Sequence, residues 1–171
     1  SFFASGLKEW AISLARIQNR EVVLGMVYSP TLDELYYAKK GTGTYLNDER
    51  IYVSKENNLK NAIVNIAQDT VRIYNRSDID QRLIKACRAH WVTASSALAY
   101  GRLAAGRIHV AVHMGQPIWD ITPGIVLVEE AGGRFTTWNE DKDFVMNGER
   151  VNNVIASNST LHKQAIALLN K

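Results

Sequence analysis

The sequence predicts a layered α/β fold, in which an antiparallel meander of strands precedes a mixed sheet covered by helices. Two observations predict it. The first 55 residues contain short alternating apolar runs that are separated by turn residues. The remaining residues alternate short apolar strands with helical patterns, which is typical of a sheet with helical cover. We therefore expect two parts, residues 1–60 with the antiparallel sheet and residues 61–171 with the mixed α/β arrangement.

The first part is expected to be a meander of short strands. Turn chemistry at Ser29–Asp33 separates two alternating runs, and Asn47–Asp48 separates a later pair. Gly41 and Gly43 interrupt the pattern between these turns. The predicted strands are 11–17, 21–28, 34–38, 45–46 and 51–53.

The second part is expected to mix strands with helices. The predicted strands are 62–67, 108–113, 134–138 and 154–157, and the predicted helices are 78–90, 95–105, 121–131 and 160–170. Gly106 is expected to stop the second of these helices as its C′ residue. Ile125–Val128 is apolar all round, so the third helix should be buried on most sides before Gly132 and Gly133 end it.

The composition limits the classes of function. With 171 residues, 46% of them hydrophobic, the chain is long enough to bury a core. The net charge of +3 comes without a basic block, so we expect no nucleic-acid partner. No apolar run reaches the length of a membrane span and no signal peptide is visible, so we expect no membrane partner. Cys87, the only cysteine, cannot form an internal disulfide and suits a reducing, cytoplasmic setting.

Asp120 stands between a tryptophan and a long apolar run, and two roles are open to it. As a cap, it lies near the N-terminus of the helix, facing free amides and the positive end of the helix dipole. Pro123 then falls in the first turn, where a missing N–H costs nothing. As a ligand, Asp120 holds Mg²⁺ at the rim of a cleft while the helix end attracts a phosphate. One carboxylate cannot make a Mg²⁺ site alone, and these residues by themselves favour the cap.

Three blocks of sequence resemble the inositol monophosphatase family, whose members are lithium-sensitive, magnesium-dependent phosphatases. The blocks are Trp119-Asp120 with Gly124 and Glu130–Gly133; Leu24–Pro30 with Glu34–Ala38 and Lys40–Gly43; and Ser95–Leu98 with Ala104–Arg107. They occur in the family's order and spacing and cover nearly the whole chain. The resemblance implies an inositol-monophosphatase-like layered fold and makes Asp120 a metal ligand. It also places Ser95, Ser96 and His113 beside the substrate alcohol as substrate-binding residues.

The resemblance further implies that part of such an enzyme is missing from the chain. The family's other metal ligands come from a glutamate pair and from an Asp-Pro-Ile/Leu-Asp-Gly-Thr run, whose threonine helps to activate the attacking water. Neither motif occurs here. Ser1 falls directly after that threonine, so the chain corresponds to the C-terminal two-thirds of a family member. Residues 1–60 then form the C-terminal part of its antiparallel-sheet subdomain. We therefore assign no catalytic residue and expect the chain alone to be inactive.

For the intact parent chain, the resemblance implies a phosphomonoesterase that uses two or three Mg²⁺ ions, is inhibited by lithium and forms a homodimer. The substrate is expected to be a small phosphorylated alcohol, with inositol monophosphate as the first candidate. His113 stands where inositol-specific members carry an acid, so histidinol phosphate, fructose 1,6-bisphosphate and a 3′-phosphonucleotide remain alternatives. Outside this class, the chain is a folded fragment that serves only as a binding or oligomerisation unit.

Each candidate residue also has a purely structural role open to it. Ser95 is equally well placed as the N-cap of the helix that it begins. His113 fits a structural histidine at the end of a strand. Cys87 lies in a helical pattern and is expected to be a small buried apolar residue. Arg107 and Lys40 are expected at the surface.

Overall fold

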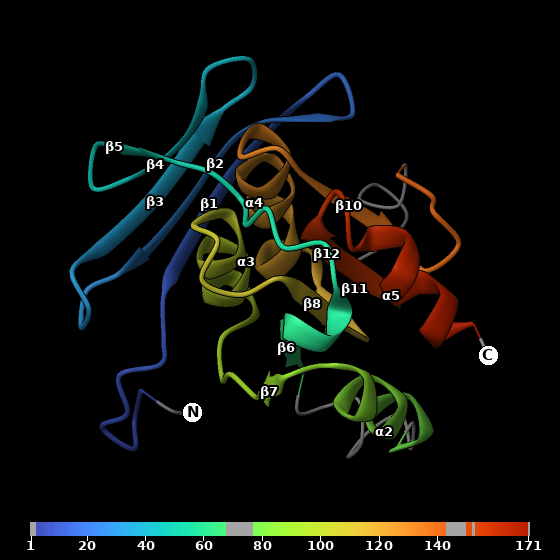
Figure 1. Cartoon of the computed structure of the whole chain (residues 1–171). Helices are drawn as coiled ribbons and strands as arrows, with labels where there is room; N and C mark the ends of the chain where they lie inside the picture. Colours follow the sequence, from blue (N-terminus) through green and yellow to red (C-terminus); the bar gives the residue numbers. More distant parts are fainter. Residues whose placement is uncertain (1–2, 68–76, 143–149, 152, 171) are drawn as a thin grey trace.

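Sheets and helical layers alternate through the molecule (Figure 1). A computed structural model describes residues 3–67, 77–142, 150–151 and 153–170. A five-stranded sheet forms the first layer and a second five-stranded sheet the third. Helices α3 (Ser96–Ala104) and α4 (Ile118–Glu130) lie between the sheets, and α2 (Ser77–Ala86) and α5 (His162–Leu169) cover the outer face of the second sheet. The predicted layered α/β fold is confirmed.

The first sheet is the predicted antiparallel meander. Its strands are β1 (Ile12–Gln18), β2 (Glu21–Ser29), β3 (Glu34–Lys39), β4 (Gly43–Leu46) and β5 (Glu49–Ile51). They lie in chain order, and each pairs antiparallel with the next. Two-residue turns at Asn19–Arg20 and Asn47–Asp48 join two of the hairpins. All four of these turn residues have positive φ, as a type I′ hairpin loop requires.

The second sheet is mixed, as predicted. Its strands are β6 (Ile63–Ile66), β7 (Ala89–Trp91), β8 (Val110–His113), β10 (Gly133–Thr137) and β12 (Val154–Asn158). The spatial order is β10-β12-β8-β6-β7, with β6 parallel to both of its neighbours and the other pairs antiparallel. A short pair, β9 (Gln116–Pro117) with β11 (Arg150–Val151), lies apart from it, and a 3₁₀ helix spans Leu59–Asn61.

The predicted boundary between residues 60 and 61 falls inside this 3₁₀ helix, between the two sheets in sequence. The helices α3 and α4 nevertheless contribute to two apolar clusters, one with the first sheet and one with the second. Whether residues 1–60 and 61–171 form separate folding units stays a prediction. No helix within the described ranges combines the length and the apolar character needed to cross a bilayer.

The helix predicted over 78–90 ends early. The structure ends α2 at Ala86, and the chain then enters the edge strand β7. The backbone amides of Arg88 and Ala89 donate to the carbonyl oxygen of Ala62, which draws this segment against β6. The pairing joins segments that are distant in sequence, so the local helical pattern does not reveal it.

Gly106 ends α3 as predicted. Its φ is +69°, a conformation that favours glycine. The amide of Gly106 donates to the Leu103 carbonyl and the amide of Arg107 donates to the Arg102 carbonyl, both at 2.9 Å. This pair of bonds is the Schellman arrangement with glycine at C′, and it satisfies two carbonyl groups at the helix end.

Helix α4 begins earlier than predicted, at Ile118, and this changes the position of two residues. Asp120 lies within the first turn, and Pro123 lies inside the helix, not in its first turn as expected. A proline inside a helix removes the N–H that would bind the carbonyl four residues before it, here that of Trp119. The Ser13 hydroxyl on β1 donates to this carbonyl oxygen at 3.0 Å. The first sheet therefore supplies the hydrogen bond that the helix lacks.

Two glycines allow the layers to approach closely. A Cβ atom on Gly124 of α4 would lie 2.5 Å from the Tyr100 ring of α3, and one on Gly101 would lie 2.8 Å from the Tyr36 ring of β3. Both tyrosines are fully buried. Contacts this short leave no room for a methyl group, so these two positions set the spacing between α4, α3 and the first sheet.

The face of the first sheet that points away from α3 and α4 carries apolar side chains. The strand registers place Leu14, Met26, Tyr37 and Tyr45 in one row across β1 to β4. Leu14 is 54% exposed, and Ile12 beside it is 57% exposed. β1 is also an edge strand of seven residues, whereas β5 at the opposite edge has three residues, two of them charged. A long apolar edge strand favours pairing with further strands.

We predict that this edge makes the chain self-associate and that Leu14→Lys weakens the association. A lysine there places a charge on the apolar row and is a common device of protected edges. We expect the association constant from sedimentation equilibrium to fall at least about tenfold, equivalent to about 1.4 kcal/mol. Ile84→Lys, at an exposed position on α2, is the control and should leave it unchanged. Equal effects of the two variants would contradict the prediction.

Candidate functional site

The helices α3 and α4 run side by side in the same direction. At their N-terminal ends, the Ser96 hydroxyl donates to Oε1 of Gln116, just before α4, at 2.6 Å. In their middles, Tyr100 packs on Gly124. Each N-terminus carries free amides and the positive end of a helix dipole. The two helix starts, Ser95–Ser96 and Ile118–Asp120, therefore lie next to each other, and we call this pair of helix starts the rim.

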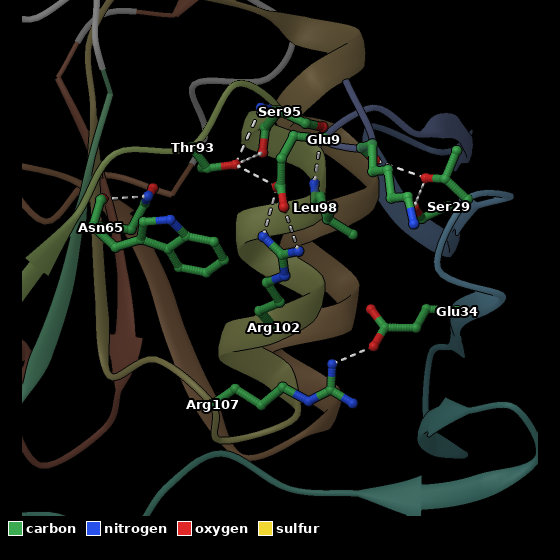
Figure 2. Close-up of polar contacts among 12 residues, drawn as sticks. Glu9, Ser29, Glu34, Asn65, Thr93, Ser95, Leu98, Arg102 and Arg107 are labelled. Atoms are coloured by element: carbon green, nitrogen blue, oxygen red, sulfur yellow. Dashed lines mark hydrogen bonds and ion pairs between the residues drawn. The ribbon is translucent and has the colours of Figure 1, made fainter. Parts of the chain in front are cut away.

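Ser95 is the N-cap of α3, as one of its two predicted roles required. Its hydroxyl accepts a hydrogen bond from the Leu98 amide at 3.3 Å. The Ser95 amide in turn donates to the Thr93 hydroxyl at 3.3 Å (Figure 2). A serine hydroxyl that accepts the capping hydrogen bond still has its own proton to donate to another group. A hydrogen bond from Ser95 to the substrate is therefore compatible with the cap and stays a prediction.

Ser96 lies on the same rim and is held by a residue that the sequence does not single out. Gln116 accepts from Ser96 through its carbonyl oxygen and donates its amide to the Met114 carbonyl at 3.0 Å. Gln116 is buried, so both ends of its side chain are satisfied inside the structure. A lone glutamine in a loop gives no sequence signal, because its partner is distant in the chain. A substrate contact by Ser96 likewise stays a prediction.

Asp120 reaches the rim from the first turn of α4. Pro117 is the N-cap of this helix and makes no side-chain cap, and no hydrogen bond of the Asp120 carboxylate occurs among the described residues. Asp120 therefore lies near the N-cap and in the first turn, as expected, although Pro117 and not the acid is the capping residue, because the helix starts at Ile118. Burial raises the pKa of the Asp120 carboxyl, and the positive charge of Arg150 partly offsets this. A half-buried carboxylate of this kind gains stability from a bound cation.

Among the described residues, Asp120 is the one candidate for the Mg²⁺ site that the resemblance implies, and its role as a ligand stays a prediction. Within the described ranges, no group of three or more His, Cys, Asp or Glu side chains could hold a metal ion together. Mg²⁺ prefers near-octahedral oxygen coordination and keeps its waters, so Asp120 alone does not make a site. Ser1, which the resemblance places directly after the missing motif, lies outside the described residues.

His113 lies in the interior and not at the rim where the sequence places it. Its ring has no exposed surface. Nδ1 lies 2.8 Å from the Tyr100 hydroxyl and Nε2 lies 2.6 Å from Oδ1 of Asn65. The Asn65 amide group donates to the Trp91 carbonyl at 2.8 Å, which turns its oxygen toward the histidine. Nε2 therefore carries the ring proton, and Nδ1 accepts from the tyrosine.

This placement favours the structural role of His113, and its contact with the substrate stays a prediction. The strand β8 alternates its side chains, so Val110 and Val112 face α2 and α5, whereas Ala111 joins the cluster under α3 and α4. His113 faces the same side as Ala111 and meets Tyr100 there. Burial lowers the pKa of the His113 imidazole to about 3, so the ring is neutral at pH 7. In this structure it serves the structural role that the sequence also left open.

The remaining candidates from the sequence have structural partners. Cys87 packs against the apolar cluster under α2 and α5, and burial raises the pKa of its thiol. Arg107 pairs with Glu34, and Lys40 pairs with Glu21 at an exposed position. These contacts agree with the structural roles expected for them.

Glu130 explains why two of the family-like blocks occur together. Its carboxylate accepts hydrogen bonds from the amides of Gly41 at 2.8 Å and Gly43 at 2.9 Å. Both glycines have φ above +80°, which a residue with a side chain rarely adopts. The C-terminus of α4 thereby holds the turn between β3 and β4. These glycines and this glutamate serve the fold at the end of α4 opposite the rim.

A family model for the inositol monophosphatase family matches residues 1–171. The chain belongs to the inositol monophosphatase family. Its similarity to the Thermotoga maritima protein named fructose-1,6-bisphosphatase/inositol-1-monophosphatase is 33% identity, over 99% of this chain and 63% of the relative. The Bacillus subtilis protein named inositol-1-monophosphatase is 34% identical, over 94% of this chain and 60% of the relative.

The fold comparison agrees with this membership. The solved structure described as the Thermotoga maritima IMPase matches with a TM-score of 0.89 and 31% identity, over 99% of this chain and 64% of that one. The inositol-monophosphatase-like fold is therefore confirmed. The chain spans between 60% and 64% of the length of these relatives.

We predict that His113 makes the fold sensitive to acid. Above pH 6.5 the ring is neutral in both states, whereas between pH 6.5 and about 3 only the unfolded state binds the proton. Stability therefore falls as the pH falls through this window, and the loss from His113 reaches roughly 2–3 kcal/mol by pH 4.5. The measurement is the free energy of urea unfolding from pH 7.5 to 4.5. Burial also lowers the pKa of the His162 imidazole to about 4, so His113→Asn should make the profile less steep and leave the share of His162, whereas His90→Asn, at an exposed position, should leave the slope unchanged. A His113→Asn profile as steep as the wild type would contradict the assignment.

Proposed function

We propose that this chain belongs to a Mg²⁺-dependent phosphomonoesterase, which in its intact form acts on a small phosphorylated alcohol, with inositol monophosphate as the first candidate substrate. One observation carries the proposal: a half-buried carboxylate, Asp120, lies at the shared rim of two helix N-termini. A phosphate monoester is an anion, so free helix amides attract it while a carboxylate holds the accompanying cation. Membership of the inositol monophosphatase family supports the same assignment.

The residues of this chain perform binding and orientation in the proposed reaction. The amides at the starts of α3 and α4 attract the negatively charged ester, and the Ser95 and Ser96 hydroxyls lie where the substrate alcohol would meet the rim. Asp120 contributes a charged oxygen ligand for the cation. When bound, Mg²⁺ supplies Lewis-acid activation of the phosphate ester. The family resemblance further implies two or three such ions and inhibition by lithium.

Four phosphorylated compounds are candidate substrates, with inositol monophosphate first. The Thermotoga maritima relative is named for both fructose-1,6-bisphosphatase and inositol-1-monophosphatase activity, which supports keeping fructose 1,6-bisphosphate beside inositol monophosphate. Histidinol phosphate and a 3′-phosphonucleotide remain further alternatives. The buried His113 does not favour one of these, because its ring does not reach the rim. We also propose a cytoplasmic homodimer without nucleic-acid or membrane partners, on the grounds of the family resemblance, the single cysteine and the mixed charge.

A second candidate is a folded unit that binds or oligomerises without catalysis. The exposed apolar edge at β1 favours it, together with the single carboxylate at the rim. Turnover separates the two candidates, since only the first requires it.

We predict that the 171-residue chain alone shows no phosphatase turnover. A single carboxylate does not organise Mg²⁺, so the chain should release no phosphate from the four candidate substrates in excess Mg²⁺. A chain completed with the part that its relatives carry in addition should release phosphate from at least one of them. Turnover by residues 1–171 of about 1 per second or more would show that the active site lies within them. No turnover by the completed chain would favour the second candidate.

We predict that Asp120→Asn, in the completed chain, lowers kcat at least about 100-fold and changes stability by less than about 1 kcal/mol. The neutral amide keeps the shape of the side chain but removes the charge that attracts the cation. Phosphate release and urea unfolding measure the two effects. Glu129→Gln is the control, because it removes an exposed acid from the other end of the same helix. Full activity of Asp120→Asn at saturating Mg²⁺ would remove Asp120 from the metal site.

A further inference from the structure

A partly buried ion pair, in which the arginine is buried, joins the start of the chain to α3. The Arg102 guanidinium donates to both carboxylate oxygens of Glu9, at 2.9 and 3.1 Å, and its Cζ lies 4.3 Å from the centre of the Trp91 ring (Figure 2). The side chain of Arg102 is 8% exposed and that of Glu9 is 35% exposed. Removing Glu9 alone would leave a buried charge without a partner, so the geometry of this pair is strongly held.

The pair extends to the N-cap of α3 through a threonine. The Thr93 hydroxyl accepts from the amide of Ser95 at 3.3 Å. Its own proton has two acceptors within reach, Oε2 of Glu9 at 3.4 Å and the Ser95 carbonyl oxygen at 3.5 Å. Ser95 in turn caps the Leu98 amide. A chain of hydrogen bonds therefore runs from Glu9 to the serine that the proposed function places beside the substrate.

The same N-terminal segment also reaches the first turn of α4. The Ser13 hydroxyl donates to the carbonyl oxygen of Trp119, which precedes Asp120. Before Glu9, the carbonyl of Lys8 accepts from the Thr31 hydroxyl at 2.7 Å, which ties the segment to the turn after β2. The segment from Lys8 to Ser13 thus contacts both helix starts of the rim.

We propose that Glu9 is a positioning residue for the rim: held by Arg102, it fixes Thr93 and through it the loop that presents Ser95 and Ser96. Ser13 does the same for the helix turn that carries Asp120. The inference rests on the proposed function for the role of the rim, but the hold of Glu9 on the Ser95 loop is measurable without turnover. Glu9 touches neither substrate nor metal in this assignment.

Residue-resolved amide hydrogen exchange of the 171-residue chain tests the hold. Thr93→Val removes the link and leaves the ion pair intact, so the amides of Ser95 and Leu98 should exchange at least about fivefold faster while the rest of α3 is unchanged. Because Thr93→Val also removes the acceptor of the Ser95 amide, the double variant Glu9→Gln/Arg102→Met tests Glu9 itself. It leaves no uncompensated charge and should also speed exchange at Ser95 and Leu98, apart from any change next to Arg102 in the last turn of α3. Glu34→Gln is the matched control, because it breaks the Arg107 pair at the opposite end of α3. Faster exchange spread evenly over the chain would show a general contribution to stability and overturn the proposal, and so would no change.

Kinetics of the completed chain test the effect on the rim. Thr93→Val should raise KM for inositol monophosphate about fivefold or more and lower kcat less, because the loop that meets the substrate is displaced and Asp120 is not. Faster amide exchange confined to Ser95 and Leu98, together with an unchanged KM, would show that the loop does not meet the substrate. This result would overturn the positioning role but not the proposed phosphatase function. Faster amide exchange confined to Ser95 and Leu98, without phosphatase turnover by the completed chain or its variants, would rule out the proposed function. Glu9 would then have only a structural role.

Discussion

The close packing of α4 on α3 is the constraint on which the rest of the structure depends. Gly124 meets the Tyr100 ring at a distance that admits no side chain, and Gly101 meets Tyr36 in the same way on the opposite side of α3. The contact brings the two helices together with their N-termini at one end. Their dipoles therefore add at the rim, and their C-termini lie at the other end, where Glu130 holds the glycine turn between β3 and β4.

A buried polar chain fixes this helix pair on the second sheet. Tyr100 hydrogen bonds to His113, His113 to Asn65, and Asn65 to the Trp91 carbonyl, so that α3, β8, β6 and β7 are joined in one line. Every donor in the line has an acceptor only while the imidazole is neutral. Burial makes such a network specific, because a shift of one strand would leave buried polar groups without partners. Trp91 in turn stacks on Arg102, which leads to Glu9 and to the loop before α3.

The sequence predicts the layers well and the ends of elements less well. Alternation and turn residues identify the meander, and Gly106 marks the end of α3, because these signals are local. β7, β9 and β11 are two or three residues long and exist only through pairing with distant segments. The predicted start of α4 was wrong because Pro123 is tolerated inside the helix. There the Ser13 hydroxyl donates to the Trp119 carbonyl oxygen, in place of the N–H that a proline lacks. The direction of the His113 side chain could not be predicted, because a histidine at a strand end has two faces available and only packing decides between them. Gln116 and Glu9 gave no signal, since their partners are far away in the chain.

The central claim is that Asp120 holds a divalent cation at the shared rim of α3 and α4. Mn²⁺, which accepts the same oxygen ligands as Mg²⁺ and broadens nearby NMR signals, locates such a site directly even when binding is weak. In a titration of the completed chain with substoichiometric Mn²⁺, the account predicts selective broadening of the amide signals of Trp119, Asp120 and Ile121. It also predicts the loss of this broadening in Asp120→Asn. Broadening centred on other acids, or broadening at these amides that persists in Asp120→Asn, would contradict it.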